Sequence, residues 1–113
     1  MIKIMLTGAL GNDCEVREVG EKKAIKFNVA VNLDYKDGDG NKVEKTEWVR
    51  AVLWKSGSQS TKIADYLKKG QKVYIEGIPS SEGYESKEGG VKSALAVNVK
   101  DIELIGSKPE SKN

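Results

Sequence analysis

Hydrophobic and polar residues alternate along much of this chain, and the clearest alternation spans residues 24–35. Every odd position in this segment is apolar or aromatic: Ile25, Phe27, Val29, Val31, Leu33 and Tyr35. Successive side chains of a strand point to opposite faces, so the pattern predicts a long strand with one buried face.

Four other segments also show strand patterns. Residues 2–10 carry apolar side chains on even positions, and residues 47–55 and 71–77 carry them on odd positions. Residues 91–104 begin with apolar odd positions and end with apolar even positions, with the change near Asp101. Because one inserted residue reverses the parity of a strand, this change predicts a β-bulge.

The hydrophobic period lengthens between residues 56 and 70, which predicts one short helix. Ser58 or Ser60 would cap its start, and Gly70 suits the position just past its end. Its inward face would carry Ile63, Tyr66 and Leu67.

The order of these elements predicts an all-β fold. Three strands, a helix and two strands form a five-stranded OB-fold Greek-key barrel, with the helix between the third and fourth strands. Residues 14–19 are expected to be a short extended piece, and residues 36–46 and 78–90 to be long polar loops. We expect one domain over residues 1–106 and a short polar tail over residues 107–113.

Composition narrows the chemistry. The chain has no histidine and one cysteine, Cys14, so the usual zinc sets and Ser/His/Asp triads cannot form. We expect no enzyme, catalytic residue, metal or cofactor. No stretch approaches the roughly 20 apolar residues of a membrane span, and the first residues do not resemble a signal peptide. A cytoplasmic location without membrane attachment is the expectation.

The loop sequence "DGDGN" partly matches a calcium-binding loop. Asp37, Asp39 and Asn41 fall on its first, third and fifth positions. Lys42 then replaces the required glycine, and Trp48 replaces the glutamate at position twelve. The segment is interpreted as a polar hairpin loop.

Both tryptophans lie in "EWVRAVLWK", residues 47–55. In a strand, Trp48, Arg50 and Trp54 share one face, and the other face resembles core. The indoles, about 20 Å apart along six residues of strand, would stack unpaired bases. The alternative is that one or both plug the barrel end or lie in a subunit contact.

Net charge is only +2, so an anionic partner must be argued from where the charges lie. Three lysines near the tryptophans, Lys36, Lys45 and Lys55, would contact phosphates, or else are solvated surface charges. Tyr35 and Tyr84 stand at the edges of the two long loops, where an OB barrel reaches toward nucleic acid, or else anchor those loops.

Three segments, "LGNDCEVR", "TEWVRAVLW" and "YLKKGQKVYIEG", resemble hallmark segments of the bacterial single-stranded DNA-binding protein family. The resemblance covers about residues 2–106 and implies a homotetramer of OB-folds around which DNA wraps. It places the base-stacking side chains on Tyr35, Trp48, Trp54 and Tyr84, and the basic contacts on Lys3, Arg50 and Lys69.

The function expected from this resemblance is binding of single-stranded DNA without sequence specificity in replication, recombination and repair. One alternative is an OB dimer similar to primosomal replication protein N, which binds single strands and a helicase. Another is an oligosaccharide-binding or purely structural OB module. The family typically continues to an acidic tip that recruits repair enzymes, so recruitment through residues 107–113 is not expected.

Overall fold

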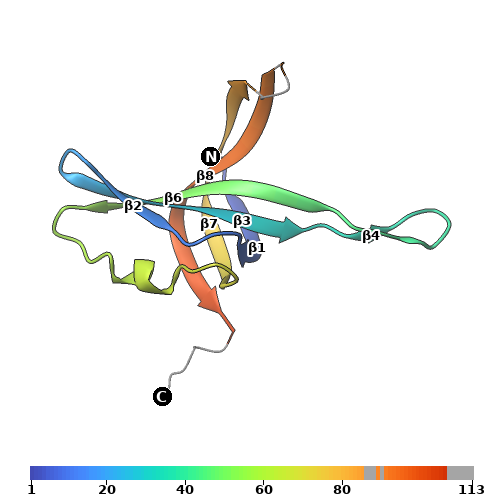
Figure 1. Ribbon diagram of the computed structural model, residues 1–113, viewed down its shortest axis with the longest axis horizontal. Helices are drawn as coiled ribbons and strands as arrows, with labels where there is room; N and C mark the ends of the chain where they lie inside the picture. The colour runs from blue at the N-terminus through green and yellow to red at the C-terminus, as the bar shows by residue number, and fades with distance from the viewer. Residues whose placement is uncertain (86–88, 90, 107–113) are drawn as a thin grey trace.

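The computed structural model describes residues 1–85, 89 and 91–106 and consists almost entirely of strands (Figure 1). The predicted tail over residues 107–113 lies outside this range. The elements are β1 (Ile4–Leu10), β2 (Glu15–Val19), β3 (Lys22–Asn32), β4 (Tyr35–Lys36), β5 (Lys42–Val43), β6 (Thr46–Ser56), the 3₁₀ helix η1 (Lys62–Tyr66), β7 (Lys72–Glu85) and β8 (Val91–Ile105).

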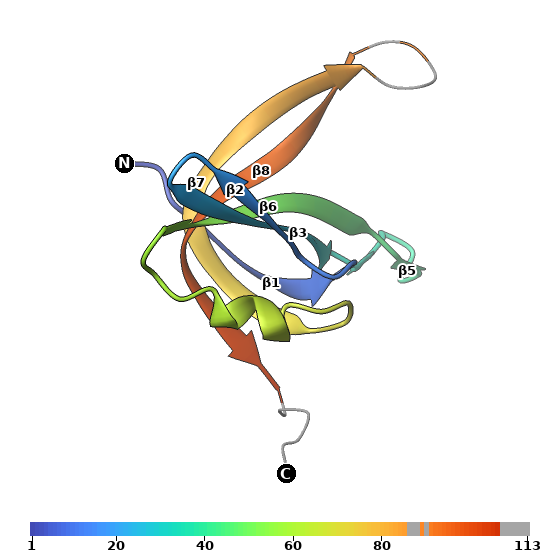
Figure 2. The same ribbon diagram turned by 60° about the vertical axis from the view of Figure 1, so that its left-hand side comes forward.

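Five strands close into a barrel (Figure 2). The sheet runs β1-β7-β8-β6-β3-β2, and β1 also pairs with β3 through Ala9–Ala30 and Leu10–Val29, which joins the two sides. β6 and β8 pair in parallel, and the other neighbours are antiparallel. The predicted OB-fold barrel is confirmed, with β2 added outside it on β3.

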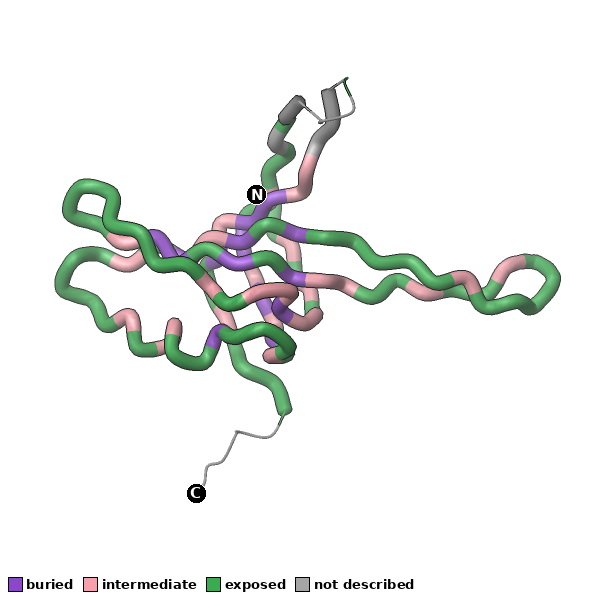
Figure 3. Tube along the Cα trace, viewed as in Figure 1, coloured by how far each residue is buried: buried purple, intermediate pink, exposed green. Residues whose placement is uncertain are grey.

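The barrel interior is filled by the predicted alternating positions (Figure 3). No polar or charged side chain of a described residue is buried with them. The core comprises Leu10, Ile25, Phe27, Val29, Val49, Ala51, Leu53, Leu67, Val73, Ile75, Val97 and Val99. The period-two pattern of β3 and β6 therefore fixes which of their faces is buried.

The predicted bulge is confirmed in β8. Glu76 pairs with Asp101 and Gly77 pairs with Val99, so Lys100 is the extra residue. Gly77 lies tightly against β8 here, because a Cβ on it would be 2.3 Å from the carbonyl oxygen of Asn98. The bulge explains why the inward parity changes between Val99 and Ile102.

The helix predicted between the third and fourth strands is present as a 3₁₀ helix of five residues. It ends at Tyr66, which is exposed, and Leu67 just beyond it is fully buried. The Thr61 side chain does not cap its start, but Oγ of Ser60 accepts from the Lys62 amide at 3.1 Å. Gly70, predicted just past the helix end, instead lies in the turn before β7 with φ +91°, because the helix ends at Tyr66 with Leu67 as its C-cap. Within the helix, Ile63 and Ala64 are only partly buried against the core, so little apolar packing supports a longer helix.

The extended piece predicted over residues 14–19 is confirmed as the edge strand β2, whose five residues are all exposed. Two other predicted boundaries were wrong. The strand predicted over 24–35 ends at Asn32, and Leu33 and Tyr35 are exposed. Most of the loop predicted over 78–90 continues β7, because backbone pairing with β8 needs no apolar side chains.

Two hairpin arms project from the barrel (Figure 1). The first, tipped by β4 and β5, joins β3 to β6 and points to the right in this view. The second is formed by the outer halves of β7 and β8 and rises at the top. η1 lies at the other end of the barrel from the second arm (Figure 2).

Candidate nucleic-acid interface

The outward residues of β3 and β6 form one continuous surface. Their antiparallel register sets Ala30 beside Trp48, Asn28 beside Arg50, Lys26 beside Val52 and Ala24 beside Trp54. We call the surface made by Lys26, Asn28, Trp48, Arg50, Val52 and Trp54 the tryptophan face. Its two strands are central in the sheet, so the surface rests on a rigid support.

Both indoles of the tryptophan face reach solvent. Trp48 is 54% exposed and Trp54 is 40% exposed, whereas Val49 between them is 1% exposed. Neither ring belongs to the barrel core. A large exposed aromatic ring is costly to leave in water, so two of them on one strand mark a surface suited to a flat ligand.

Trp48 is held from below by the turn after β1. A Cβ on Gly11 would be 2.4 Å from Cζ3 of Trp48, so the ring lies directly over this glycine. The turn is tied to β3, because the Gly11 amide donates to the Asn28 carbonyl (3.0 Å) and Asn12 Oδ1 accepts from the Asn28 amide (3.2 Å). The absence of a side chain at Gly11 therefore lets the indole contact this turn while 54% of Trp48 stays exposed.

A cleft of about 370 Å³ lies beside Trp54 on the tryptophan face. It includes Arg50, Lys26 and Asn28, and Ala96 of β8 contributes a small, nearly buried side chain. Sequence reasoning did not select Lys26, Asn28 or Ala96. Lys26 and Asn28 occupy the polar, even-numbered positions of residues 24–35. That pattern shows that they belong to the site only when β3 is known to pair with β6.

Lys3 lies away from this surface, beside β7. Its Nζ is 2.6 Å from Oε1 of Glu76, and the Tyr74 hydroxyl donates to Oε2 of Glu76 at 2.5 Å. The hydrogen bond from Lys3 to Glu76 raises the pKa of Lys3. The hydrogen bond from Tyr74 to Glu76 raises the pKa of Tyr74 to about 12. The same bonds, from Lys3 first and then Tyr74, lower the pKa of Glu76. β8 separates β7 from β6 in the sheet, so the structure does not bring Lys3 to the tryptophan face.

The remaining predicted residues spread outward from the tryptophan face. Tyr35 is 53% exposed on the first arm, and Lys55 is half-buried near the end of β6, opposite Lys23. Lys69 is exposed, and its amide donates to Asp13 Oδ1 at 2.8 Å. Tyr84 is in β7, and its side chain lies outside the described residues.

The Asp37 carboxylate stabilises the loop at the tip of the first arm. Asp37 Oδ1 accepts from the amides of Asp39 and Asn41, both at 2.9 Å. Within the described residues, no group of three or more metal-ligating side chains occurs. The interpretation of this segment as a hairpin loop agrees with these bonds.

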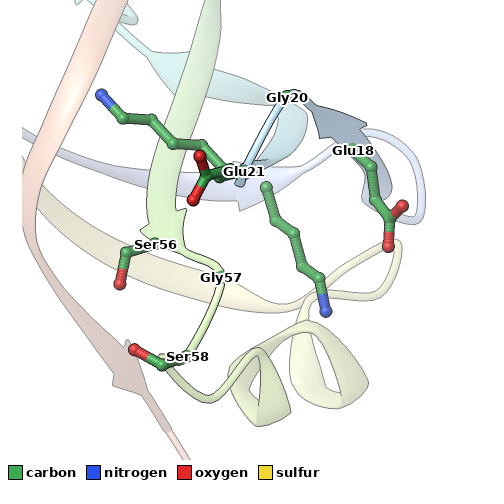
Figure 4. Close-up of a pocket in the computed structure, with 8 residues that line it drawn as sticks. Glu18, Gly20, Glu21, Ser56, Gly57 and Ser58 are labelled. Carbon is green, nitrogen blue, oxygen red and sulfur yellow. The ribbon is translucent and has the colours of Figure 1, made fainter.

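A larger cleft, of about 890 Å³, lies between the β2–β3 turn and the end of β6 (Figure 4). Glu18 and Glu21 line it together with Lys22 and Lys23, so its charges are mixed. A mixed rim gives a polyanion little net attraction. Size alone therefore does not select this cleft as the binding site.

None of the helices in the described part of the chain is long and apolar enough to cross a membrane.

Comparison with known proteins identifies the family. The model of the single-strand binding protein family matches residues 1–105. Single-stranded DNA-binding protein 1 of Chlorobaculum tepidum is 39% identical over 108 residues, which cover 94% of this chain and 65% of the relative. Single-stranded DNA-binding protein 1 of Xylella fastidiosa is 33% identical over 111 residues, which cover 96% of this chain and 80% of the relative.

The chain thus spans just under two thirds of the length of the first of these relatives. A Plasmodium falciparum SSB solved in complex with ssDNA shares the fold, with a TM-score of 0.74 at 24% identity, over 94% of this chain and 96% of that one. The small single-stranded DNA-binding protein of Streptomyces coelicolor has a TM-score of 0.73 at 16% identity, over 92% and 94%. The family match over residues 1–105 and the 33% identity to the Xylella fastidiosa relative, of which 80% is covered, show that this chain belongs to the single-strand binding protein family.

Proposed function

We propose that this chain binds single-stranded DNA without sequence specificity and catalyses no reaction. The observation that carries the proposal is the tryptophan face, where two exposed indoles flank Arg50 on one strand. Unpaired bases of any sequence present a flat face to such rings, and each stacked base is worth about 1–3 kcal/mol. The names of the relatives support the same function.

Phosphate contacts would come from the basic side chains around the rings. Arg50 lies between the indoles, and Lys26 lines the same cleft. We propose Lys55 and Lys69 as further contacts, and Tyr35 and Tyr84 as stacking residues that reach the strand from the arms. Lys3 also stays a prediction, although a phosphate would compete with Glu76 for its ammonium group.

We further propose that residues 1–106 act as the DNA-binding domain of a cytoplasmic homotetramer serving replication, recombination and repair. These roles are those of the family, and they come to this chain through the match over residues 1–105. The same match favours this assignment over an OB dimer similar to primosomal replication protein N.

Tryptophan fluorescence with unlabelled oligo-dT tests the proposal. Because both tryptophans of the chain lie on the proposed surface, stacking should quench most of the emission, and the affinity should fall as salt rises. Duplex DNA of the same length is the control, since its bases are not available for stacking. Absence of quenching by oligo-dT at low salt would contradict DNA binding and favour an oligosaccharide-binding or structural module.

A further inference from the structure

A second cleft lies on the other side of Trp54. It has a volume of about 720 Å³, and Trp54 lines both this cleft and the smaller one beside Arg50. The start of β3, the end of β6 and the bulge of β8 meet here, contributing Lys22, Lys55 and Lys100. We call this cleft, with its three lysines, Gln59 and Asn98, the lysine cleft.

The lysine cleft carries positive charge only. Its own lining contains no carboxylate, whereas the cleft of Figure 4, which shares Lys22 with it, is also lined by Glu18 and Glu21. Within the described part of the chain, none of its three lysines forms an ion pair. Like charges that line one cleft repel one another, and a bound anion would relieve that repulsion.

Polar groups that suit a phosphodiester accompany these charges. Gln59 Oε1 accepts from the Ser56 amide at 2.7 Å, which orients the side-chain amide and leaves its nitrogen as a donor. Asn98 is half-buried in β8 and pairs with Val52 of β6. Lys100 is the residue that the bulge inserts, so a local irregularity of β8 supplies the third charge.

We propose that the lysine cleft binds consecutive phosphates of the single strand whose base stacks on Trp54. This proposal rests on the proposed function. Trp54 lines both clefts. A nucleic acid whose base stacks on Trp54 could therefore contact Arg50 in one cleft and Lys22, Lys55 and Lys100 in the other. The ligand class is a single-stranded nucleic acid backbone, and the volume lies within the roughly 300–1,000 Å³ of small-ligand sites.

The test compares Lys22→Ala/Lys100→Ala with the wild type and with Lys72→Ala, a control that removes an exposed β7 lysine outside both clefts. Affinity for oligo-dT is measured by tryptophan fluorescence over a range of salt concentrations. We expect the slope of log affinity against log salt to shrink by about 0.7 per lysine, or about 1.4 for the double variant. Quenching at saturation should stay unchanged, Lys72→Ala should match the wild type, and Lys22→Arg/Lys100→Arg should restore the slope.

An unchanged slope in the double variant, or a loss no larger than that of Lys72→Ala, would overturn the lysine cleft while wild-type quenching upheld DNA binding. Absence of quenching in the wild type would overturn the proposed function and this inference with it. Circular dichroism of each variant checks that the exposed substitutions leave the barrel folded.

Discussion

At the scale of single residues, the two tryptophans allow a decision between stacking and core packing. Because both rings are exposed, Trp48→Ala or Trp54→Ala should weaken oligo-dT binding by about 1–3 kcal/mol. The melting temperature should stay within a few degrees of wild type, since neither ring belongs to the core. Binding is measured by anisotropy of labelled oligo-dT, and stability by thermal melts.

Val49→Ala is the matched control on the same strand. Val49 is 1% exposed, so its truncation should lower stability while the folded protein keeps its affinity. Tryptophan variants that lost about 3–5 kcal/mol of stability, yet bound normally when folded, would show that the rings serve packing. Base stacking would then be sought at Tyr35 and Tyr84.

Tyr74 should ionise at a higher pH than an ordinary phenol. Its hydrogen bond to Glu76 raises its pKa to about 12 from the ordinary 10. A raised folded-state pKa means that this contribution to stability is complete below pH 10 and is lost as the pH rises through about 12. Ultraviolet titration should show one of the four phenols ionising near pH 12.

Glu76→Gln supplies the control for that titration, since it removes the carboxylate that Tyr74 and Lys3 share. The late phenol step should move toward pH 10. Glu76 itself has a lowered pKa, so its contribution is present above pH 4.5 and is lost on acidification through its folded-state value. If the titration of Glu76→Gln matched that of wild type, the assignment of the late step to Tyr74 would be wrong.

At the scale of elements, Gly77 should be required for the close pairing of β7 with β8 at the bulge. In Gly77→Ala, the new Cβ would meet the Asn98 carbonyl oxygen at 2.3 Å and Cγ1 of Val97 at 2.7 Å. Both neighbours lie in a paired strand and cannot easily retreat, so we expect about 1–3 kcal/mol of destabilisation. A thermal melt should show this as a decrease of at least several degrees.

Gly38→Ala is the matched control, because a Cβ at Gly38 meets nothing within 4 Å and its φ is not positive. It should change stability by less than about 1 kcal/mol. Equal melting temperatures for the two variants would mean that β8 can shift to accommodate a methyl group at the bulge.

The hydrophobic pattern predicted some strands of this fold and not others. Strands that fill the barrel were predictable, because residues such as Val29 and Val49 must alternate with outward polar ones. The pairing of β2 with β3 and the outer half of β7 were not, since both rest on backbone hydrogen bonds and leave no apolar period. The bulge at Lys100 was predictable because it reverses the parity of a buried face.

At the scale of the whole molecule, the candidate site was only partly predictable. Trp48, Arg50 and Trp54 share a face in any straight strand, so one segment sufficed to group them. Lys26 and Lys100 join them only after β3 and β8 are placed on either side of β6, which requires the barrel topology. Lys3 followed from the family resemblance, and its ion pair with Glu76 requires the β1–β7 pairing that sequence alone does not specify.

The final prediction concerns assembly. One barrel offers a single strand a few stacking rings and phosphate contacts, and several linked copies bind far more tightly through effective concentration. Exposed apolar side chains such as Met5 on β1 and Ile105 on β8 are available for contacts between copies. We expect light scattering at micromolar concentration to give about 49 kDa, four times the 12.3 kDa chain.

A stable monomer would contradict an oligomer, and a mass of about 25 kDa would show a dimer in place of the tetramer. Repeating the measurement with oligo-dT separates the two origins of assembly, since a mass that rises only with DNA would show that the strand, and not the protein surface, gathers the copies.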